Sequence, residues 1–399
     1  MRVLYVQGGA ERAGAERMLA YLLKYLDKER FEPKVLFTSA GPFVDEVADL
    51  GIEVEVVPGP RLRNIASWHQ AIDSIKRVAV DHGARLIHAN GEKMSIFAAR
   101  AASQSGIPSI AWLHDAPAAG GVGGRLAQRM LARSHPSSVV CCSGWLASDF
   151  NDKLDLGAVT IANGLDLDSL PVDAGAAKRL AAEQGWPTDA LIVGHFTRLQ
   201  RWKGTEFFLR AAAIVIEQHP DARFVVVGGV LYGREAGLVE ELQGIRASLG
   251  LEDKVSFAGY RADALEVMAG CDIVVHCSVR PDPFPTVVLE GMALGKPVIA
   301  TTTRGPEEAI EDKVTGTLVP PADPGALADA ISQLADRPDI RVEIGRAAAT
   351  VVKQKYNAAR MAHEFQDLYL KLSSTTSSKD PEGTSAGQPA PGQNRAGRI

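Results

Sequence analysis

The chain has 399 residues, which is enough for two domains of ordinary size. Hydrophobic residues make up 46% of it and the formal net charge is -5, so the composition argues against a disordered chain and against a nucleic-acid partner. No apolar run approaches the roughly 20 residues that a membrane span needs.

The first residues already have the pattern of a strand, and no signal-peptide pattern precedes them, so we expect a cytoplasmic protein. The four cysteines lie in or beside apolar, strand-like runs and show no CxxC spacing. This favours buried, reduced thiols over disulfides or a metal site. The cysteines are Cys141, Cys142, Cys271 and Cys277.

Short apolar runs alternate with helical patterns through the first half of the chain. We predict strands at residues 3–7, 34–38, 54–57, 86–89, 109–113 and 138–142. We predict helices at about 15–27, 65–82, 94–105 and 123–134. The alternation is typical of parallel strands joined by crossover helices, and it predicts a doubly wound α/β domain.

The same alternation then starts again. Strands are predicted at residues 191–197, 224–227, 255–258, 272–276 and 297–300, with helical patterns between them. The sequence therefore predicts two α/β domains in tandem. Because ligands of such sheets bind beyond the carboxyl ends of the strands, the residues that follow each strand are the candidates for function.

After the first strand, Gly-Ala-Glu-Arg occurs twice, and the second copy, at residues 14–17, leads into an amphipathic helix. A glycine at position 14 lets the backbone approach a ligand closely. The stretch is not a Gly-x-Gly-x-x-Gly fingerprint, and a plain loop before a capped helix is the alternative.

His114 directly follows the fifth predicted strand, at the edge of the sheet where ligands bind. We interpret it as a ligand contact. The alternative is a structural histidine that hydrogen-bonds to the following loop.

A glycine-rich loop at residues 120–124 precedes a helix with Arg125, Arg129 and Arg133 on one stripe. Such a stripe suits anionic lipid head groups at the inner face of the membrane, or a phosphorylated acceptor. A solvated basic face is the simpler account.

Asp166 and Asp168 form an Asp-x-Asp pattern, a spacing that can hold a divalent metal. They follow a short strand predicted at 159–162 and precede the change of domain. We interpret them as part of a turn, and predict no metal site.

Arg198 lies at the end of the first strand of the second half, and Lys203 is expected five positions later, in the first turn of the next helix. Two cations beside a helix N-terminus can stabilise a diphosphate without a metal. The alternative is a pair of unpaired surface cations.

Residues 278–301 hold the strongest signal. A helix should begin at Thr286, with Thr286 as its N-cap, after Pro283 and Pro285. Its first turn, which includes Val287, then offers unpaired N–H groups and the positive end of the helix dipole, which together bind anions.

One turn further along, Glu290 has almost only apolar neighbours. Burying a carboxylate there costs several kcal/mol, order of magnitude, unless something hydrogen-bonds to it, and a ribose diol would serve. Asp282, eight positions earlier, could reach hydroxyls beyond the phosphate. The alternative is a loop carboxylate and a solvated helix residue.

These motifs together resemble the retaining glycosyltransferases of family 4, which carry an acidic residue, seven residues and then a glutamate in this strand–loop–helix setting. The family usually has glutamate first, whereas this chain has Asp282. Arg198 and the Lys203–Gly204 pair also match the family pattern. The resemblance covers about residues 1–370.

The resemblance implies the GT-B fold, in which two Rossmann-like doubly wound domains face a cleft. It implies an acceptor domain at 1–170 and a nucleotide-sugar donor domain at 171–353, with a helix at about 354–372 that packs back onto the first domain. Residues 373–399 are almost devoid of large apolar side chains, so we predict a disordered tail.

The resemblance also implies roles for residues of the donor domain. Arg198 and Lys203 should hold the diphosphate, with help from the N–H groups at the start of the helix. Glu290 should bind the ribose and Asp282 the transferred sugar. The remaining donor contacts expected from this domain are the main chain near Tyr260 and Arg261, beside the nucleobase, and the loop residues Phe284, Pro285, Thr286 and Val287.

From the first domain, His114 should face the sugar and Gly14 should lie near the phosphates. The implied activity is transfer, with retention and without a metal or other cofactor, from a UDP- or GDP-linked sugar to a saccharide or lipid-linked acceptor, as in bacterial polysaccharide or glycoconjugate synthesis. Two alternatives stay open, namely a nucleotide-sugar 2-epimerase of the same architecture and a non-catalytic nucleotide-sugar-binding protein.

Overall fold

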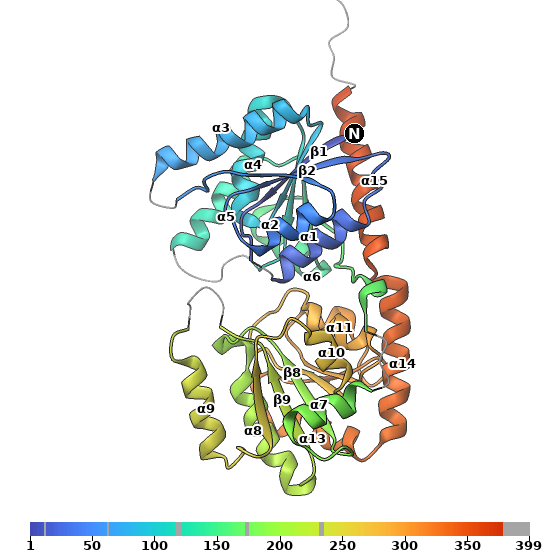
Figure 1. The fold of residues 1–399 in the computed structure, drawn as a ribbon. Coiled ribbons are helices and arrows are strands. Elements are labelled where there is room, and N and C mark those ends of the chain that lie inside the picture. Colours follow the sequence, from blue (N-terminus) through green and yellow to red (C-terminus); the bar gives the residue numbers. More distant parts are fainter. Residues whose placement is uncertain (12, 62–63, 117–121, 172–174, 231–234, 378–399) are drawn as a thin grey trace, which may run out of the picture.

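The computed structural model describes residues 1–11, 13–61, 64–116, 122–171, 175–230 and 235–377. It contains two α/β domains, one above the other in Figure 1, each built on a parallel sheet. The predicted pair of Rossmann-like domains is therefore confirmed.

The N-terminal sheet has the strand order β3-β2-β1-β4-β5-β6-β7, with parallel pairings throughout its described strands. Its strands are β1 (Arg2–Gln7), β2 (Glu32–Phe37), β3 (Glu53–Val56), β4 (Leu86–Asn90), β5 (Ser109–Leu113), β6 (Ser138–Cys141) and β7 (Val159–Thr160). The helices between them are α1 (Gly14–Lys24), α2 (Pro42–Asp49), α3 (Ile65–His82), α4 (Glu92–Ser105), α5 (Val122–Ser134) and α6 (Gly144–Leu154). The strand order reverses between β1 and β4, and a ligand of such a sheet binds at that switch point.

The C-terminal sheet has the order β10-β9-β8-β11-β12-β13, again parallel, with its switch point between β8 and β11. Its strands are β8 (Ile192–Phe196), β9 (Arg223–Val227), β10 (Val255–Gly259), β11 (Ile273–His276), β12 (Val298–Thr301) and β13 (Thr317–Val319). Its helices are α7 (Ala176–Gln184), α8 (Thr205–Gln218), α9 (Leu238–Ser248), α10 (Ala264–Ala269), α11 (Thr286–Ala293), α12 (Gly305–Ala309), α13 (Pro324–Ala335) and α14 (Pro338–Lys355).

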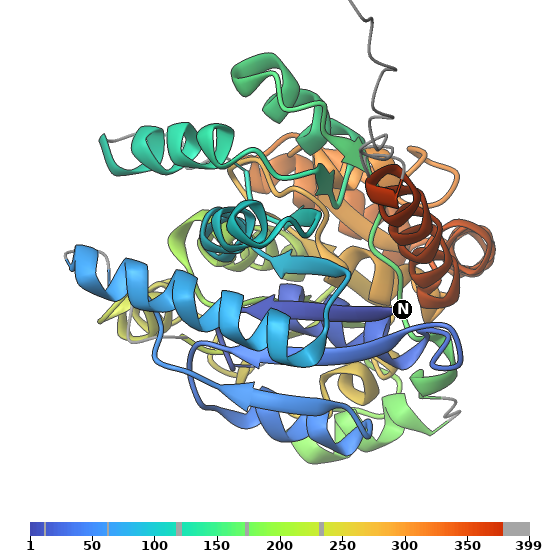
Figure 2. The same cartoon turned by 90° about the horizontal axis from the view of Figure 1, so that it is seen from above.

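The chain returns to the N-terminal domain through α15 (Ala358–Ser377), which lies against α1 and beside the start of β1 (Figures 1 and 2). The Tyr369 hydroxyl of α15 lies 2.7 Å from His88 Nδ1 and 3.2 Å from the Tyr5 hydroxyl, inside the N-terminal core. One face of the last helix thus contributes to the first domain's core, although the helix follows the second domain in sequence.

The helix α15 is longer than the sequence pattern predicted. A tail was expected from residue 373, but the helix continues to Ser377. In this last turn Ser373 Oγ donates to Leu370 O and Ser374 Oγ donates to Lys371 O. The rest of the predicted tail, residues 378–399, lies outside the described residues.

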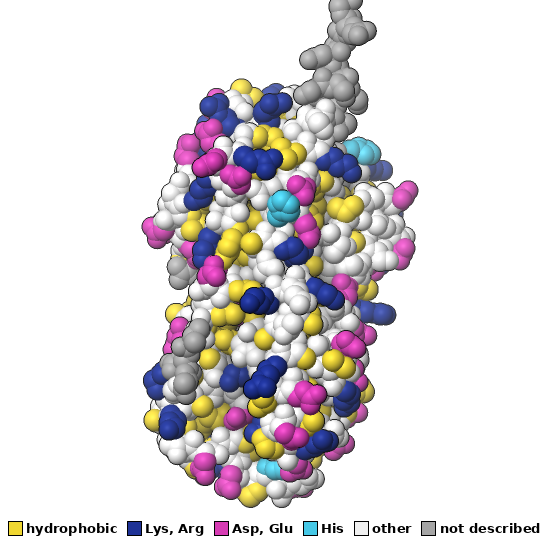
Figure 3. All heavy atoms as spheres, turned by 90° about the vertical axis from the view of Figure 1, so that its right-hand side faces the viewer, with side chains coloured by type: hydrophobic (Ala, Val, Ile, Leu, Met, Phe, Trp, Pro, Cys, Tyr) yellow, Lys and Arg dark blue, Asp and Glu magenta, His cyan; other side chains and the backbone are white. Residues whose placement is uncertain are grey.

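Both domains have apolar interiors that include Trp112, Phe150, Phe208 and Phe224. All four cysteines are buried and free, as predicted. Positive and negative side chains are interspersed over the face that carries α15 (Figure 3). Within the described ranges, no helix combines the length and the apolar character that crossing a membrane requires.

Candidate functional site

The loop after β8 places Lys203 differently from the prediction. Lys203 is not in the first turn of α8 but ends a short 3-10 turn (Arg201–Lys203), and α8 begins at Thr205. Gly204 separates the 3-10 turn from α8, because it adopts a left-handed conformation (φ 76°). A side chain at this position would come within 1.9 Å of the Cys277 carbonyl oxygen, which follows β11. This turn directs Lys203 inward.

Lys203 and Asp282 form an ion pair at the switch point between β8 and β11. Lys203 Nζ donates to Asp282 Oδ2 at 2.5 Å and lies 4.1 Å from the centre of the Trp202 ring. Ser278 Oγ donates to the same oxygen at 3.0 Å, and His276 Nε2 lies 2.9 Å from it. Burial alone would raise the pKa of Asp282, but Lys203 and His276 outweigh it and hold that pKa well below its usual range.

The helix α11 follows this carboxylate directly. Pro285 has the extended conformation of an N-cap (φ -66°, ψ 118°), so Thr286 is the first helical residue and not the cap that the sequence predicted. Val288 N–H bonds to Pro285 O, but no residue in the described part of the chain accepts a hydrogen bond from the N–H of Thr286 or Val287. An anion could therefore bind these two donors.

Glu290, one turn into α11, is buried, and its carboxylate has a partner in the other domain. Arg17 Nη1, from α1, donates to Glu290 Oε1 at 2.5 Å. The side chain of Glu290 is 10% exposed and that of Arg17 is 44% exposed. Among the described residues, the Arg17 guanidinium is thus the hydrogen-bonding partner of this buried carboxylate, and its binding to a ribose stays a prediction.

The N-terminus of α1 faces this part of the second domain. A side chain at Gly14 would meet no other atom within 4 Å, so the space beside it is open. Burial raises the pKa of Glu16, while its backbone N–H, the Gln7 amide and the positive charge of Arg198 act in the opposite direction. Arg198 of the second domain therefore lies within electrostatic reach of the first turn of α1.

His114 follows β5 and is half-buried. Its Nε2 lies 2.6 Å from Asn90 Oδ1, at the end of β4, and its ring is 4.5 Å from that of Trp112, centre to centre. Burial lowers the pKa of His114 to about 3, so the ring is neutral at pH 7.

The other predicted donor contacts differ in how available their side chains are. Tyr260 is 63% exposed. The Arg261 guanidinium donates to Asp263 at 2.6 and 2.7 Å and also to Glu183, and these bonds raise its pKa. Phe284 is buried, 5.4 Å from the Tyr356 ring. Of these three side chains, the exposed Tyr260 is the one available to a ligand.

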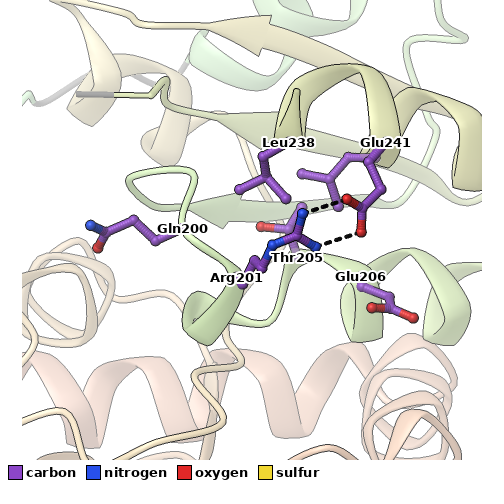
Figure 4. A pocket seen from close by; sticks show the side chains of 7 residues that line it. Gln200, Arg201, Thr205, Glu206, Leu238 and Glu241 are labelled. Atoms are coloured by element: carbon purple, nitrogen blue, oxygen red, sulfur yellow. Dashed lines mark hydrogen bonds and ion pairs between the residues drawn. The ribbon is translucent and has the colours of Figure 1, made fainter. Parts of the chain in front are cut away.

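A small pocket of about 130 Å³ lies on the outer side of the same loop (Figure 4). Arg201 closes it by a two-pronged ion pair with Glu241 of α9, with both N–O distances at 2.6 Å. Leu238 and Leu242 form the apolar wall. Arg201 is therefore engaged with α9, whereas Lys203 of the same loop pairs with Asp282 at the switch point.

Asp166 and Asp168 are held by residues of α1 and its C-terminal cap. Tyr25 Oη donates to Asp166 Oδ1 at 2.6 Å and to Asp168 Oδ2 at 2.9 Å, and Lys24 Nζ donates to Asp166 Oδ2. These contacts support the interpretation of the Asp-x-Asp pattern as a turn that joins the domains.

The sequence did not single out Gln7, Asn90, His276 or Arg17. The first three end β1, β4 and β11, so the rule that functional residues follow strands would have found them. Arg17 ends the second Gly-Ala-Glu-Arg copy, and its role depends on a helix 273 positions away.

Two family models match the chain. "Glycosyltransferase Family 4" matches residues 12–169 and "Glycosyl transferases group 1" matches residues 177–351. A D-inositol 3-phosphate glycosyltransferase of Saccharomonospora viridis is 31% identical over 215 residues, which is 53% of this chain and 49% of that protein. An alpha-D-kanosaminyltransferase of Streptomyces kanamyceticus is 29% identical over 185 residues, 46% of each chain. The chain thus spans about half the length of the curated relatives it matches.

Solved structures match over more of the chain. Anabaena HepE in complex with UDP and glucose has a TM-score of 0.83 at 27% identity, covering 93% of this chain and 100% of that one. A sucrose-phosphate synthase from Thermosynechococcus elongatus has a TM-score of 0.79 at 20% identity, covering 94% and 99%, and so shares the fold. These likenesses confirm the predicted GT-B fold. With both family models matched in order along the two domains, the chain belongs to the group 1 glycosyltransferases of family 4 type.

Proposed function

We propose that this protein is a retaining glycosyltransferase that moves a sugar from a UDP- or GDP-linked donor to a saccharide or lipid-linked acceptor. The observation that carries the proposal is the unit formed by Lys203, Asp282 and α11. It offers a buried ammonium, two unpaired N–H groups and the Glu290 carboxylate along one loop and helix. This order of groups suits a diphosphate followed by a ribose. The UDP and UDP-glucose complexes of HepE support a nucleotide-sugar donor.

The proposed reaction breaks the bond between the anomeric carbon and the diphosphate oxygen and forms a bond from the acceptor oxygen to that carbon. The acceptor proton moves to the leaving diphosphate oxygen. We assign the role of base to the leaving diphosphate oxygen, because Asp282 and Glu290 are each bonded to a cation, and reaction on one face of the sugar then gives retention. Lys203, Arg198 and the α11 N–H groups would stabilise the charge on the departing diphosphate.

The acceptor would bind the N-terminal domain, near loops at about 59–70 and 115–125, parts of which lie outside the described residues. Arg125, Arg129 and Arg133 of α5 are exposed. They suit an acceptor that carries phosphate or lies at an anionic lipid surface, so a peripheral contact with the inner face of the membrane is part of the proposal.

The experiment is a panel of UDP- and GDP-linked sugars tested by thermal shift, followed by incubation of the best binder with saccharide and lipid-linked acceptors. A donor at 100 times its Kd stabilises the folded state by about 2.7 kcal/mol, so a true donor raises the Tm. Mass spectrometry then detects the product, and NMR of the anomeric proton reads its configuration. An inverted product contradicts retention.

Two other results would replace the proposal. Epimerisation of the donor in the absence of any acceptor would indicate a 2-epimerase. Tight donor binding with neither hydrolysis nor transfer would indicate a non-catalytic binding protein.

We further propose that transfer needs no divalent metal, because protein cations stand where the diphosphate charge would develop and because Asp166 is already bonded to Lys24 and Tyr25. We expect turnover to be unchanged after EDTA treatment and dialysis. A loss that added Mg²⁺ or Mn²⁺ restores would contradict this.

A further inference from the structure

A chain of hydrogen bonds runs through the switch point of the N-terminal sheet, from α1 to His114. Gln7 Nε2 donates to Glu16 Oε1 at 3.0 Å, and Asn90 Nδ2 donates to Gln7 Oε1 at 2.7 Å. His114 Nε2 lies 2.6 Å from Asn90 Oδ1. Gln7 is 3% exposed and Asn90 is 5% exposed, so water does not compete for these bonds.

Backbone carbonyl groups fix the direction of this chain. Gln7 Nε2 also donates to Gly9 O at 2.9 Å, and Asn90 Nδ2 also donates to Ala15 O at 3.2 Å. A carbonyl oxygen only accepts, so each amide must turn its NH₂ group toward it. Neither amide can flip without setting two acceptors against each other.

The direction of the chain decides the tautomer of His114. Asn90 presents its oxygen to the ring, so Nε2 must carry a proton and donate. Burial lowers the pKa of His114 to about 3, so the neutral ring has no second proton. Its Nδ1 is left as an acceptor, and among the described residues none bonds to it.

The ring lies at the face where the two domains meet. Asn90 bonds to Ala15 in the first turn of α1, the same turn that faces the charge of Arg198. Arg17 of that helix touches Glu290 of the second domain. A donor held by Arg198 and Glu290 would bring its sugar against this part of the first domain.

We propose that Asn90, oriented by Gln7, is a positioning residue that locks His114 as the Nε2–H tautomer, so that Nδ1 accepts a hydrogen bond from one hydroxyl group of the transferred sugar. The inference rests on the proposed function for the identity of the ligand. This arrangement makes the site specific for a nucleotide sugar that carries that hydroxyl group. A sugar without the hydroxyl would leave the Nδ1 lone pair of His114 without a hydrogen bond when it binds.

The first test reads the tautomer and needs no turnover. In protein labelled with ¹⁵N-histidine at pH 7, long-range ¹H–¹⁵N spectra should show His114 with a protonated Nε2 and a bare Nδ1, and His114→Gln identifies the signal. Asn90→Leu should give a mixture of tautomers. A wild-type ring protonated on Nδ1, or on both nitrogens, overturns the proposal.

The second test uses the donor from the panel above and its four mono-deoxy analogues. Wild-type protein should discriminate against one deoxy donor by roughly 10- to 100-fold in kcat/KM. Asn90→Leu should lose most of that discrimination while its affinity for the free nucleoside diphosphate, bound by the other domain, stays unchanged. Gln7→Leu should have a smaller effect, because Ala15 O still anchors Asn90.

If Asn90 has only a structural role, Asn90→Leu should lower stability and should lower turnover of every nucleotide sugar by the same factor. The ratio of kcat/KM between the parent and the deoxy sugars would then stay unchanged, and this result would also overturn the proposal. Failure of the proposed function is separate, since it would appear as no turnover by the wild-type protein while the tautomer spectrum still gives its answer.

Discussion

Lys203 and Asp282 are both buried, so each depends on the other to balance its charge. Their side chains are 12% and 8% exposed, and removing one partner of such a pair leaves the other as an uncompensated charge. His276 and Ser278 would still bond to Asp282, but neither replaces the ammonium group of Lys203. A simple truncation of Lys203 therefore changes stability as well as chemistry.

We expect Lys203→Ala to lose both turnover and stability, and the double variant Lys203→Met with Asp282→Asn to recover stability but not turnover. The loss of turnover should be about 10²- to 10³-fold, as for other groups that stabilise transition-state charge. Urea unfolding and initial rates measure the two effects. Arg201→Ala, in the same loop but paired with Glu241, is the control and should remain active. Near-normal turnover of the double variant would refute the diphosphate role.

Glu290→Gln should weaken nucleotide binding by roughly 10-fold or more, because hydrogen bonds to a charged group contribute about 1.5–3 kcal/mol. Isothermal titration calorimetry with UDP and GDP measures it. Arg17→Gln is the matched control, since it removes the ion pair but keeps the carboxylate, and it should bind the nucleotide at least as well. Equal weakening in both variants would mean that Glu290 acts only through Arg17.

At the scale of elements, the turn that ends at Gly204 decides where Lys203 points. A left-handed residue at this position is strained for any side chain, and the Cys277 carbonyl leaves no room for one. Helix periodicity could not show this, because the sequence pattern of α8 continues smoothly back through Lys203. The first turn of a helix and a preceding 3-10 turn differ only in hydrogen bonding.

We expect Gly204→Ala to lower the unfolding free energy by more than the roughly 1 kcal/mol that strain alone costs, and to reduce turnover because Lys203 shifts. Gly14→Ala provides the comparison. A side chain at Gly14 meets open space within α1, so stability should be kept or slightly raised, while a nearby diphosphate would be obstructed. Thermal unfolding and donor affinity separate the two cases, and equal stability losses would contradict the steric argument.

The elements that the sequence predicted well are those with strong local signals. The helix expected at 65–82 is α3 (Ile65–His82), which Asn64 caps at its start and Gly83 ends in the left-handed conformation. The strand expected at 109–113 is β5 (Ser109–Leu113), buried along its whole length. The short α2 (Pro42–Asp49) was not predicted, because its 8 residues make only about two turns, which give too few repeats to establish a period.

At the scale of the molecule, contacts between residues far apart in sequence join the domains. Besides Arg17 and Glu290, the Glu308 carboxylate accepts from the backbone N–H groups of Gly144 and Trp145 at 2.8 and 2.5 Å, at the start of α6. The contact between the domains therefore includes charged groups that a ligand or a domain movement can exchange.

Each domain also buries a neutral histidine, His88 in the first and His195 in the second. Burial lowers their pKa values to about 3 and about 4, below the ordinary 6.5. The unfolded chain therefore binds more protons than the folded chain below pH 6.5, so stability falls as the pH falls. Asp282 does not contribute to the change of stability between pH 6.5 and 4. The stability that its lowered pKa provides is fully present above the ordinary pKa of an aspartate and is lost only at lower pH.

We expect the unfolding free energy to fall by up to about 1.4 kcal/mol per pH unit for each of these histidines as the pH is lowered from 6.5 toward 4. Urea unfolding at pH 7, 6 and 5 measures it, and His88→Phe should reduce the slope. A flat profile over this range would show that these histidines titrate normally in the folded protein.

The sequence by itself determined the two α/β domains, the family and the charged residues of the candidate site, because periodicity, capping residues and the spacing of Arg198, Lys203, Asp282 and Glu290 are local properties of the chain. Only the tertiary structure decided what these groups bond to. In it, Lys203 pairs with Asp282 and Arg17 pairs with Glu290. Asn90 accepts a hydrogen bond from His114 Nε2 and so sets the tautomer of that ring. The physical reason is that strand order brings distant residues to one sheet edge, and no local pattern records which of them meet.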